Sequence, residues 1–387
     1  MRRLLLVLAV LIVGAGGILF ATTASGGVPL APFAPPPPVQ VVYEPADGAT
    51  DVDPKAPVSI AVTDGRIVEV TLTGDKGGEI EGTLSPDGLR WEAQGPLRYG
   101  ATYTWSGTVE DTAGTRSPLQ GSFTTKKPTK VVRGTLNIGD GRTVGIAAPI
   151  RIQFNAHVAD KAAVERALKV TTSKPVEGSW GWLPDEGGGS RVDFRPKEYW
   201  PAYTEVRVEA NLEGVDYGGG AVGAANLTSS FTIGRAQIVK ADVNSYRMIV
   251  IRDGKQVMDF PASYGLDSDP ERNTRSGIHV VSEKFTDKRM VSERYDYDVV
   301  VKWAVRISNN GEFIHANPDS LAAQGSSNVT HGCVNLSVEN AKTYYDSALY
   351  GDPVEVTGTP IQLGPRDGDI WDWTVPWSQW KTMSALN

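Results

Sequence analysis

Cysteine is almost missing from this chain: its 387 residues include one, Cys333. A single cysteine can form no intramolecular disulfide and no cysteine-rich zinc site. Histidine is scarce as well, with four residues, so we expect neither a metal nor any other cofactor. The formal net charge of −7 also argues against binding to nucleic acid, whose phosphates attract basic proteins. What a lone cysteine does in this chain is therefore the first question.

The composition is that of a folded protein with several domains. Hydrophobic residues make up 40% of the chain, which is enough to build real cores. The 42 Gly and 25 Pro are too few for a collagen-like or wholly disordered chain. At roughly 150 residues per domain, the length predicts two or three domains.

The N-terminus carries an export pattern. Residues 1–3 are basic at Arg2 and Arg3, residues 4–21 are apolar throughout, and small residues follow, as in a secretory signal. An apolar stretch of this length also reaches the lower limit for a membrane span. We therefore expect residues 1–25 to be a signal peptide or a membrane anchor, and the chain to be exported to the periplasm-facing side of the cell envelope. Residues 26–40 are Pro-rich and form a semi-rigid linker.

Two segments of short predicted strands follow, at 41–127 and 128–235. Residues 58–62 alternate with period two, and Asp-Gly pairs supply turns, a pattern typical of an immunoglobulin-like β-sandwich. The Ser-Phe-Thr triplet at 122–124 returns at 230–232, which indicates a degenerate second copy. Neither segment holds a constellation of reactive groups. We interpret both as spacers or scaffolds rather than ligand-binding modules.

The segment 236–360 is predicted to be β-rich with one main helix. Arg-Asp-Gly-Lys at 252–255 separates two apolar strands as a hairpin turn. Ser337 is placed to cap a helix that runs to Leu349. The extension 361–387 holds four Trp; such a cluster binds carbohydrate or braces a neighbouring domain, and we favour the brace. The predicted fold class is therefore mostly β, with two immunoglobulin-like sandwiches before this domain and its Trp-rich C-terminal extension.

Candidate chemistry gathers around Cys333. In an oxidising compartment a free thiol is either buried or used. His331 lies two residues before it, and His315 lies farther upstream. Because the thiolate is the nucleophile, a nearby imidazole or backbone dipoles must make it available. His331 is thus either an activating base or a donor that stabilises charge. Gly332 lets backbone amides approach a reacting carbonyl, as an oxyanion hole requires.

The spacing of His315 and the run Thr-His-Gly-Cys-Val-Asn at 330–335 resembles the signature of the YkuD-type L,D-transpeptidases. The similarity covers about 236–357, and the whole arrangement resembles actinobacterial, mycobacterium-like members. The resemblance implies peptidoglycan stem peptides as partners. Cys333 would attack the third residue of a tetrapeptide stem, expel D-Ala, and pass the acyl group to the amine of a second stem as a 3-3 cross-link. Carbapenem β-lactams would acylate the same cysteine.

The resemblance also implies roles for the surrounding residues. His315, oriented by a backbone carbonyl, would take the thiol proton and return it to the leaving amine. His331 and the amides of Gly332 and Cys333 would stabilise the oxyanion with the hydroxyl of Tyr297. The remaining implied positions bind substrate, at Asn310, Gly311 and Asn335, or belong to the lid over the cleft, at Met290 and Tyr295. The chain reads Thr-Arg-Ser-Gly at 274–277, where family members often carry Thr-Pro-x-Gly, and its lid is short; both departures bear on lid shape and acceptor preference.

Two other functions stay open at this point. An exported cysteine hydrolase, an L,D-carboxypeptidase, would use the same site with water as the acceptor. A non-catalytic wall-binding protein would rely on the two sandwiches instead. A sortase is disfavoured because the motif places no arginine near the thiol. A papain-like enzyme is disfavoured because there the cysteine precedes its histidine.

Overall fold

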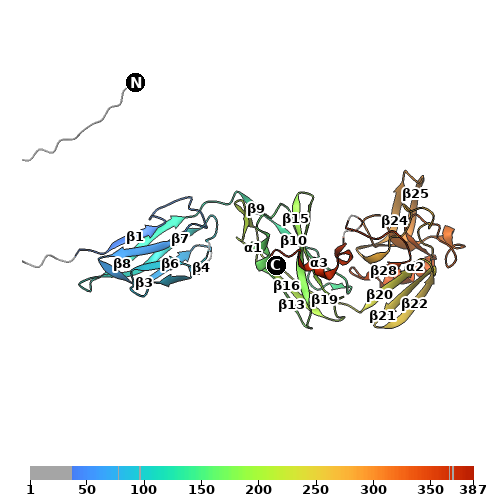
Figure 1. Cartoon of the computed structure of the whole chain (residues 1–387), viewed down its shortest axis with the longest axis horizontal. Helices are drawn as coiled ribbons and strands as arrows, with labels where there is room; N and C mark the ends of the chain where they lie inside the picture. Colours follow the sequence, from blue (N-terminus) through green and yellow to red (C-terminus); the bar gives the residue numbers. More distant parts are fainter. Residues whose placement is uncertain (1–36, 77, 96, 366, 368–369) are drawn as a thin grey trace, which may run out of the picture.

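The computed structural model describes residues 37–387 apart from 77, 96, 366, 368 and 369. The predicted signal or anchor, and residues 26–36 of the Pro-rich linker, lie outside this part of the chain. Within it, no helix combines the length and the apolar character needed to cross a membrane. The strands form three bodies that follow one another along the long axis of the molecule (Figure 1).

The first body is a sandwich of two four-stranded sheets, with orders β1-β2-β6-β5 and β4-β3-β7-β8. Trp91 and Trp105 come from opposite sheets and meet edge to face, with their ring centroids 5.3 Å apart. Residues alternate between buried and exposed over the first half of β7, as the period-two pattern predicts for a strand with one face in the core. Its strands are β1 (Gln40–Glu44), β2 (Ser59–Thr63), β3 (Gly65–Gly74), β4 (Gly78–Ile80), β5 (Gly82–Leu84), β6 (Arg90–Ala93), β7 (Thr102–Asp111) and β8 (Arg116–Thr124).

The second body repeats this architecture with sheets of order β10-β12-β15-β14 and β11-β19-β16-β13, and adds a three-stranded sheet β17-β18-β9. Val192, Val208 and Phe231 belong to one core between the two larger sheets. Val164 of the short helix α1 (Lys161–Arg166) joins this core. The strands are β9 (Lys130–Val132), β10 (Gly134–Leu136), β11 (Thr143–Val144), β12 (Ile150–Phe154), β13 (Leu168–Thr172), β14 (Gly178–Glu186), β15 (Gly189–Pro196), β16 (Glu205–Ala210), β17 (Asp216–Gly218), β18 (Ala221–Gly223) and β19 (Leu227–Ile233).

The third body contains two sheets, β22-β21-β20-β28-β23 and β24-β25-β26-β27. Their shared core includes Tyr344 of helix α2. Ser337 caps this helix as predicted, because its side chain accepts the Asn340 amide at 3.1 Å. The elements are β20 (Gln237–Asp242), β21 (Arg247–Arg252), β22 (Lys255–Pro261), β23 (Gly277–Val280), β24 (Glu283–Ser292), β25 (Tyr297–Arg306), β26 (Phe313–Ala316), the 3₁₀ helix η1 (Pro318–Ser320), β27 (Val334–Leu336), α2 (Val338–Ser347) and β28 (Pro353–Thr357).

The C-terminal extension returns to the second body. It contains the 3₁₀ helix η2 (Asp372–Thr374) and the helix α3 (Trp377–Lys381), and α3 lies beside the second sandwich in Figure 1. Trp380 is buried, and its indole N–H donates to the carbonyl of Ser179 on β14 at 3.0 Å. This packing is what the brace interpretation predicts.

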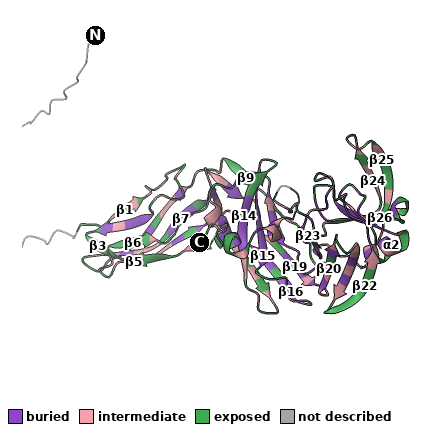
Figure 2. Cartoon of the chain, turned by 45° about the vertical axis from the view of Figure 1, so that its right-hand side comes forward, coloured by how far each residue is buried: buried purple, intermediate pink, exposed green. Residues whose placement is uncertain are grey.

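The second sandwich and the β24–β25 hairpin differ in how far their strands are buried. β15 of the second sandwich is buried along its whole length, whereas the outer part of the β24–β25 hairpin is exposed (Figure 2). The structure confirms the predicted fold class, a mostly β chain with one main helix in its third body.

Candidate active site

A parallel strand pair brings the two halves of the motif together. β26 carries His315 and β27 carries Asn335, and the two residues are direct neighbours across the ladder. Parallel neighbours need a crossover connection, which here includes η1 and the loop that ends at Cys333. The cysteine is therefore held at the start of β27, beside the strand that carries His315.

The loop before Cys333 takes its shape from the side chain of Thr330 and from the backbone of Gly332. The Thr330 hydroxyl donates to the Cys333 carbonyl at 2.7 Å and accepts the Gly332 amide at 3.3 Å. Gly332 has a φ of +111°, a region that residues with a side chain rarely adopt. The Gly332 amide was expected at the oxyanion but is used here within the loop. Among the described residues the Cys333 amide donates to no acceptor, so it is the amide left for an incoming oxygen.

The Cys333 thiol rests in its protonated form. It donates to the carbonyl of Gly311 at 3.6 Å. Burial raises the pKa of the Cys333 thiol to about 12, although a backbone hydrogen bond from Phe313 acts in the opposite direction. Since the thiolate is the nucleophile, a base must remove this proton during the reaction.

His315 has the features of that base. Its side chain is 4% exposed, and Nδ1 lies 2.8 Å from the Ala316 carbonyl. A carbonyl only accepts, so Nδ1 carries the proton and the neutral ring keeps a lone pair on Nε2. Burial lowers the pKa of His315, which keeps the ring neutral. The orienting group is a backbone carbonyl, as the family resemblance implies.

Tyr295 and Tyr297 lie beside the ring of His331, a residue that stays exposed. The Tyr295 and Tyr297 rings lie 4.6 and 5.4 Å from the His331 ring between centroids. Burial, followed by the positive charge of Arg272, lowers the pKa of His331. Burial and then the nearby Cys333 charge raise the pKa of Tyr297. Tyr297 therefore keeps its phenolic proton and remains a hydrogen-bond donor.

Two cavities meet at Cys333, with volumes of about 700 and 350 Å³. Met290, Tyr297, His331 and Cys333 line both. Together, the linings of the two cavities include every site residue predicted from the sequence. The larger one adds His315 and Asn335, and the smaller one adds Tyr295, Asn310, Gly311 and Gly332.

Asn335 lines the larger cavity and has one unpaired buried oxygen. It is 3% exposed, and its amide N–H₂ donates to the Ser320 hydroxyl at 3.5 Å. Within the described part of the chain its side-chain oxygen has no hydrogen-bond partner. Buried polar atoms are almost always paired, so this oxygen is suited to receive an N–H group from a ligand.

The comparisons with known proteins agree with this geometry. Residues 236–356 match the family model of the L,D-transpeptidase catalytic domain, and residues 49–216 match that of a bacterial Ig domain. L,D-transpeptidase 5 of Mycobacterium tuberculosis is 54% identical over 359 residues, which cover 92% of this chain and 79% of that protein. The chain belongs to the L,D-transpeptidase family.

Further relatives agree with this assignment. L,D-transpeptidase 2 of M. tuberculosis is 37% identical, over 96% of this chain and 90% of that protein. The solved LD transpeptidase LdtMt1 in complex with imipenem superposes with a TM-score of 0.50 at 31% identity, over 59% of this chain and all of that one. The family inferred from the motif is confirmed, and with it the enzyme class, an acyltransferase.

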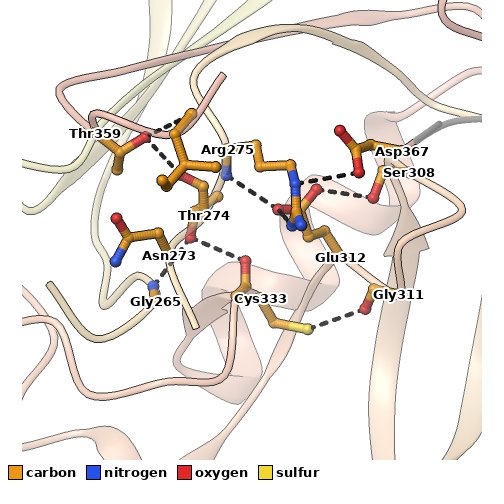
Figure 3. A network of polar contacts seen from close by, with 12 residues as sticks. Gly265, Asn273, Thr274, Arg275, Ser308, Gly311, Glu312, Cys333, Thr359 and Asp367 are labelled. Carbon is orange, nitrogen blue, oxygen red and sulfur yellow. Dashed lines mark hydrogen bonds and ion pairs between the residues drawn. The ribbon is translucent and has the colours of Figure 1, made fainter. Parts of the chain in front are cut away.

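Three residues of this transpeptidase site escaped the sequence reasoning. Arg272 donates to the carbonyls of Thr330 and Val329 at 3.0 and 2.6 Å and so supports the loop before His331. Thr274 and Glu312 lie directly behind Cys333 (Figure 3). Thr274 begins the Thr-Arg-Ser-Gly segment noted in the sequence, but the sequence assigns none of the three a role in the site, because each acts on backbone that is distant along the chain. Within the described residues, no group of His, Cys, Asp and Glu is arranged to hold a metal ion.

Proposed function

We propose that this transpeptidase forms 3-3 cross-links in peptidoglycan, with Cys333 as nucleophile and His315 as general base. The observation that carries the proposal is the position of Cys333, which lines both cavities directly before β27 and beside the strand of His315, itself in the lining of the larger cavity. Burial disfavours the charged forms of Cys333 and His315. The proton is therefore transferred as the substrate is attacked, rather than in the resting enzyme.

The first half-reaction acylates the enzyme. Cys333 Sγ attacks the carbonyl carbon of the third residue of a tetrapeptide stem, while Nε2 of His315 takes the thiol proton. The resulting oxyanion is met by the Cys333 amide, the Tyr297 hydroxyl and His331. The bond to the terminal D-Ala then breaks, and His315 returns the proton to the departing amine. The product is a thioester of Cys333.

The second half-reaction transfers the acyl group. The side-chain amine of the third residue of another stem attacks the thioester carbonyl, and His315 accepts a proton from that amine. Collapse of the oxyanion forms the new amide bond and restores the thiol. No oxidant, reductant or cofactor enters either step.

The second cavity favours transfer over hydrolysis. A hydrolase needs room for one stem and a water molecule, whereas a transpeptidase must hold two stems on either side of one carbonyl. The two cavities share Met290, Tyr297, His331 and Cys333, and their other lining residues differ. The larger, with Asn335, suits the donor stem, and the smaller leaves a separate approach for the acceptor amine.

The location of the enzyme follows from its N-terminal sequence. Residues 1–25 direct export or anchor the chain in the membrane, and the linker and both sandwiches hold the catalytic body away from the membrane surface. Stem peptides and carbapenem-type β-lactams are then its partners in the envelope. The imipenem complex of a related transpeptidase supports β-lactam binding at this site.

The test offers purified enzyme a tetrapeptide donor stem with and without a second stem as acceptor. The proposal predicts a dimer joined between third residues when the acceptor is present, and no dimer with the Cys333→Ala variant. Tripeptide as the sole product in the presence of acceptor would instead establish the carboxypeptidase alternative.

A further inference from the structure

Thr274 is a fully buried hydroxyl placed directly behind the nucleophile. Its side chain is 0% exposed. The hydroxyl donates to the carbonyl of Gly332 at 2.9 Å and accepts the amide of Gly265 at 2.9 Å (Figure 3). The hydroxyl thus acts both as donor and as acceptor, and because a carbonyl only accepts, its proton points at the Gly332 carbonyl.

This contact sets the plane of the peptide between Gly332 and Cys333. The peptide is trans, and in a trans peptide the carbonyl and the amide point in opposite directions. With the Gly332 carbonyl held toward Thr274, the Cys333 N–H must point away from it. Gly332 has a φ of +111°, so its own backbone preferences restrict this plane less than those of other residues would. The hydroxyl supplies the missing restraint.

The segment that carries Thr274 is itself anchored by buried groups. The Thr359 hydroxyl donates to the Thr274 carbonyl at 2.8 Å. The amide of Arg275 donates to the carboxylate of Glu312, which is 2% exposed, at 3.0 Å. The Ser308 hydroxyl donates to the other oxygen of the same carboxylate at 2.8 Å. The restraint on Gly332 therefore comes from a fixed support.

Glu312 connects the two sides of the thiol. It directly follows Gly311, whose carbonyl accepts the hydrogen bond of the thiol in the resting enzyme. The guanidinium of Arg275 lies 3.6 Å from its carboxylate and 3.3 Å from that of Asp367, so the buried charge is compensated. Glu312 follows Gly311, which accepts from the sulfur, and its carboxylate accepts the Arg275 amide. It thus links Gly311 to the Thr274 segment that holds the Gly332 carbonyl.

We propose that Thr274, supported by Glu312, is a positioning residue that aims the Cys333 amide at the oxyanion of the acyl-transfer transition state. The inference rests on the proposed function, because it presupposes acyl transfer at Cys333. Thr274 touches neither substrate nor sulfur in this role. It acts through the Gly332–Cys333 peptide alone.

The test compares two reactions of the same sulfur. Imipenem acylates Cys333 through an oxyanion, because the sulfur adds to the β-lactam carbonyl before the ring C–N bond breaks. Iodoacetamide alkylates the sulfur by displacing iodide, and no oxyanion forms. Imipenem acylation needs the folded site, whereas iodoacetamide also alkylates unfolded chains, so both rates are taken where circular dichroism shows the variant to be folded, and their ratio then reports the oxyanion site.

Thr274→Val removes the hydroxyl and keeps the shape of the side chain, whereas Thr274→Ser keeps the hydroxyl. Loss of one oxyanion donor lowers the rate by about 10²–10³-fold. A donor that is present but turned away from the oxyanion lowers it by less. We expect Thr274→Val to slow imipenem acylation by about 10- to 100-fold, with alkylation nearly unchanged. Thr274→Ser should restore most of the acylation rate.

Thr204→Val is the matched control in the second sandwich. Thr204 is equally buried and donates to the Pro201 carbonyl at 2.6 Å, so its replacement removes a similar hydrogen bond away from the site. It should change neither rate. The inference is overturned if Thr274→Val leaves acylation unchanged, if acylation and alkylation fall together, or if Thr274→Ser is as slow as Thr274→Val. Wild-type enzyme that imipenem does not acylate would overturn the proposed function as well.

Discussion

At the residue scale, the proposed chemistry depends on two groups whose surroundings favour their neutral forms. Burial raises the pKa of Cys333 and lowers the pKa of His315. A thiolate–imidazolium pair requires the opposite shifts. The hydrogen bond between His315 Nδ1 and the Ala316 carbonyl fixes the tautomer that leaves Nε2 basic. The nucleophile is therefore created during the attack.

The pH dependence of the two reactions of Cys333 follows from this pair. Because the thiol pKa is raised to about 12, alkylation by iodoacetamide should keep rising with pH through the alkaline range. Because the pKa of His315 is lowered, protonation removes the base only below the usual histidine range, so imipenem acylation should fall only in acid. His315→Asn should slow acylation by about 10²–10⁴-fold. An alkylation plateau at acidic pH would show a resting thiolate and contradict the account.

Tyr295 and Tyr297, the two tyrosines beside His331, allow a matched comparison of their hydroxyls. Tyr297→Phe removes a donor near the oxyanion and should lower kcat by about 10-fold or more, with little change in KM. Tyr295→Phe removes a hydroxyl that is buried and has no partner among the described residues, so kcat should hold. Steady-state rates on tetrapeptide stems check both. Equal losses in the two variants would assign no specific role to the Tyr297 hydroxyl.

The sequence predicts the reactive residues better than the residues that support them. Cys333, His315 and Asn335 are recognisable because their types and spacing form a compact motif. Arg272, Thr274 and Glu312 contact the backbone of segments distant in the sequence, and any polar residue at those positions looks alike in one dimension. Their roles become visible only when the loops meet in space.

At the element scale, the loop before Cys333 is held by the guanidinium of an arginine on a neighbouring loop. Arg272 donates to two successive carbonyls, of Thr330 and Val329, and its guanidinium lies 5.8 Å from the centroid of the Tyr295 ring. The same charge contributes to the lowered pKa of His331. Arg272 thus acts by geometry and by charge, and these effects can be separated.

Two replacements of Arg272 perform this separation. Arg272→Lys keeps the charge but loses the planar fork, so acylation by imipenem should slow by about 10-fold while the pKa of His331 stays low. Arg272→Met removes the charge as well, and the pKa of His331 should rise, since a neighbouring cation disfavours the imidazolium. An NMR titration of His331 measures this shift. An unchanged pKa in Arg272→Met would contradict the assignment.

The elements themselves were largely predictable. Period-two strands, the hairpin turn at 252–255 and the Ser337 cap are local patterns, and the structure confirms them. β18 pairs with β9 across about ninety residues, and no local signal predicts such a contact. The position of the β24–β25 hairpin over the site likewise depends on tertiary packing.

At the scale of the whole molecule, the C-terminal extension joins the catalytic body to the second sandwich. Arg195 of that sandwich lies 4.8, 5.4 and 5.0 Å from the ring centroids of Trp373, Trp377 and Trp380. Its guanidinium also donates to the Val375 carbonyl at 2.7 Å. The Trp side chains thus act as a brace around one cation. The composition of the chain predicts neither that Arg195 is the residue these Trp side chains contact nor that the contact lies on the second sandwich.

Asp372 makes this joint sensitive to pH. It is fully buried, and within the described residues neither of its carboxylate oxygens has a hydrogen-bond partner. Burial, with the nearby Asp193 charge, raises the pKa of Asp372 to about 7, although arginines including Arg191 and Arg195 act in the opposite direction. The folded chain then holds this proton more tightly than the unfolded chain. The stability it contributes is present below the ordinary Asp range and is lost as the pH rises toward 7.

Asp372→Asn removes this dependence because the amide stays neutral. The variant should raise the Tm at pH 8 by at least about 2 °C, and the rise at pH 5 should be clearly smaller, because the folded wild type still binds the proton there. Thermal unfolding followed by circular dichroism at the two pH values checks both. A lower Tm at pH 8 would show that the carboxylate is stabilised by its arginine neighbours.

The account depends most directly on a thioester at Cys333. Intact-mass measurement of the enzyme, incubated with a tetrapeptide stem and no acceptor, tests it in one step. We predict an adduct equal to the tripeptide acyl group on Cys333, together with one released D-Ala. The adduct should disappear when an acceptor stem is added and dimer forms. D-Ala release that continues undiminished in Cys333→Ala, or an unmodified enzyme in spite of turnover, would contradict covalent catalysis by this cysteine.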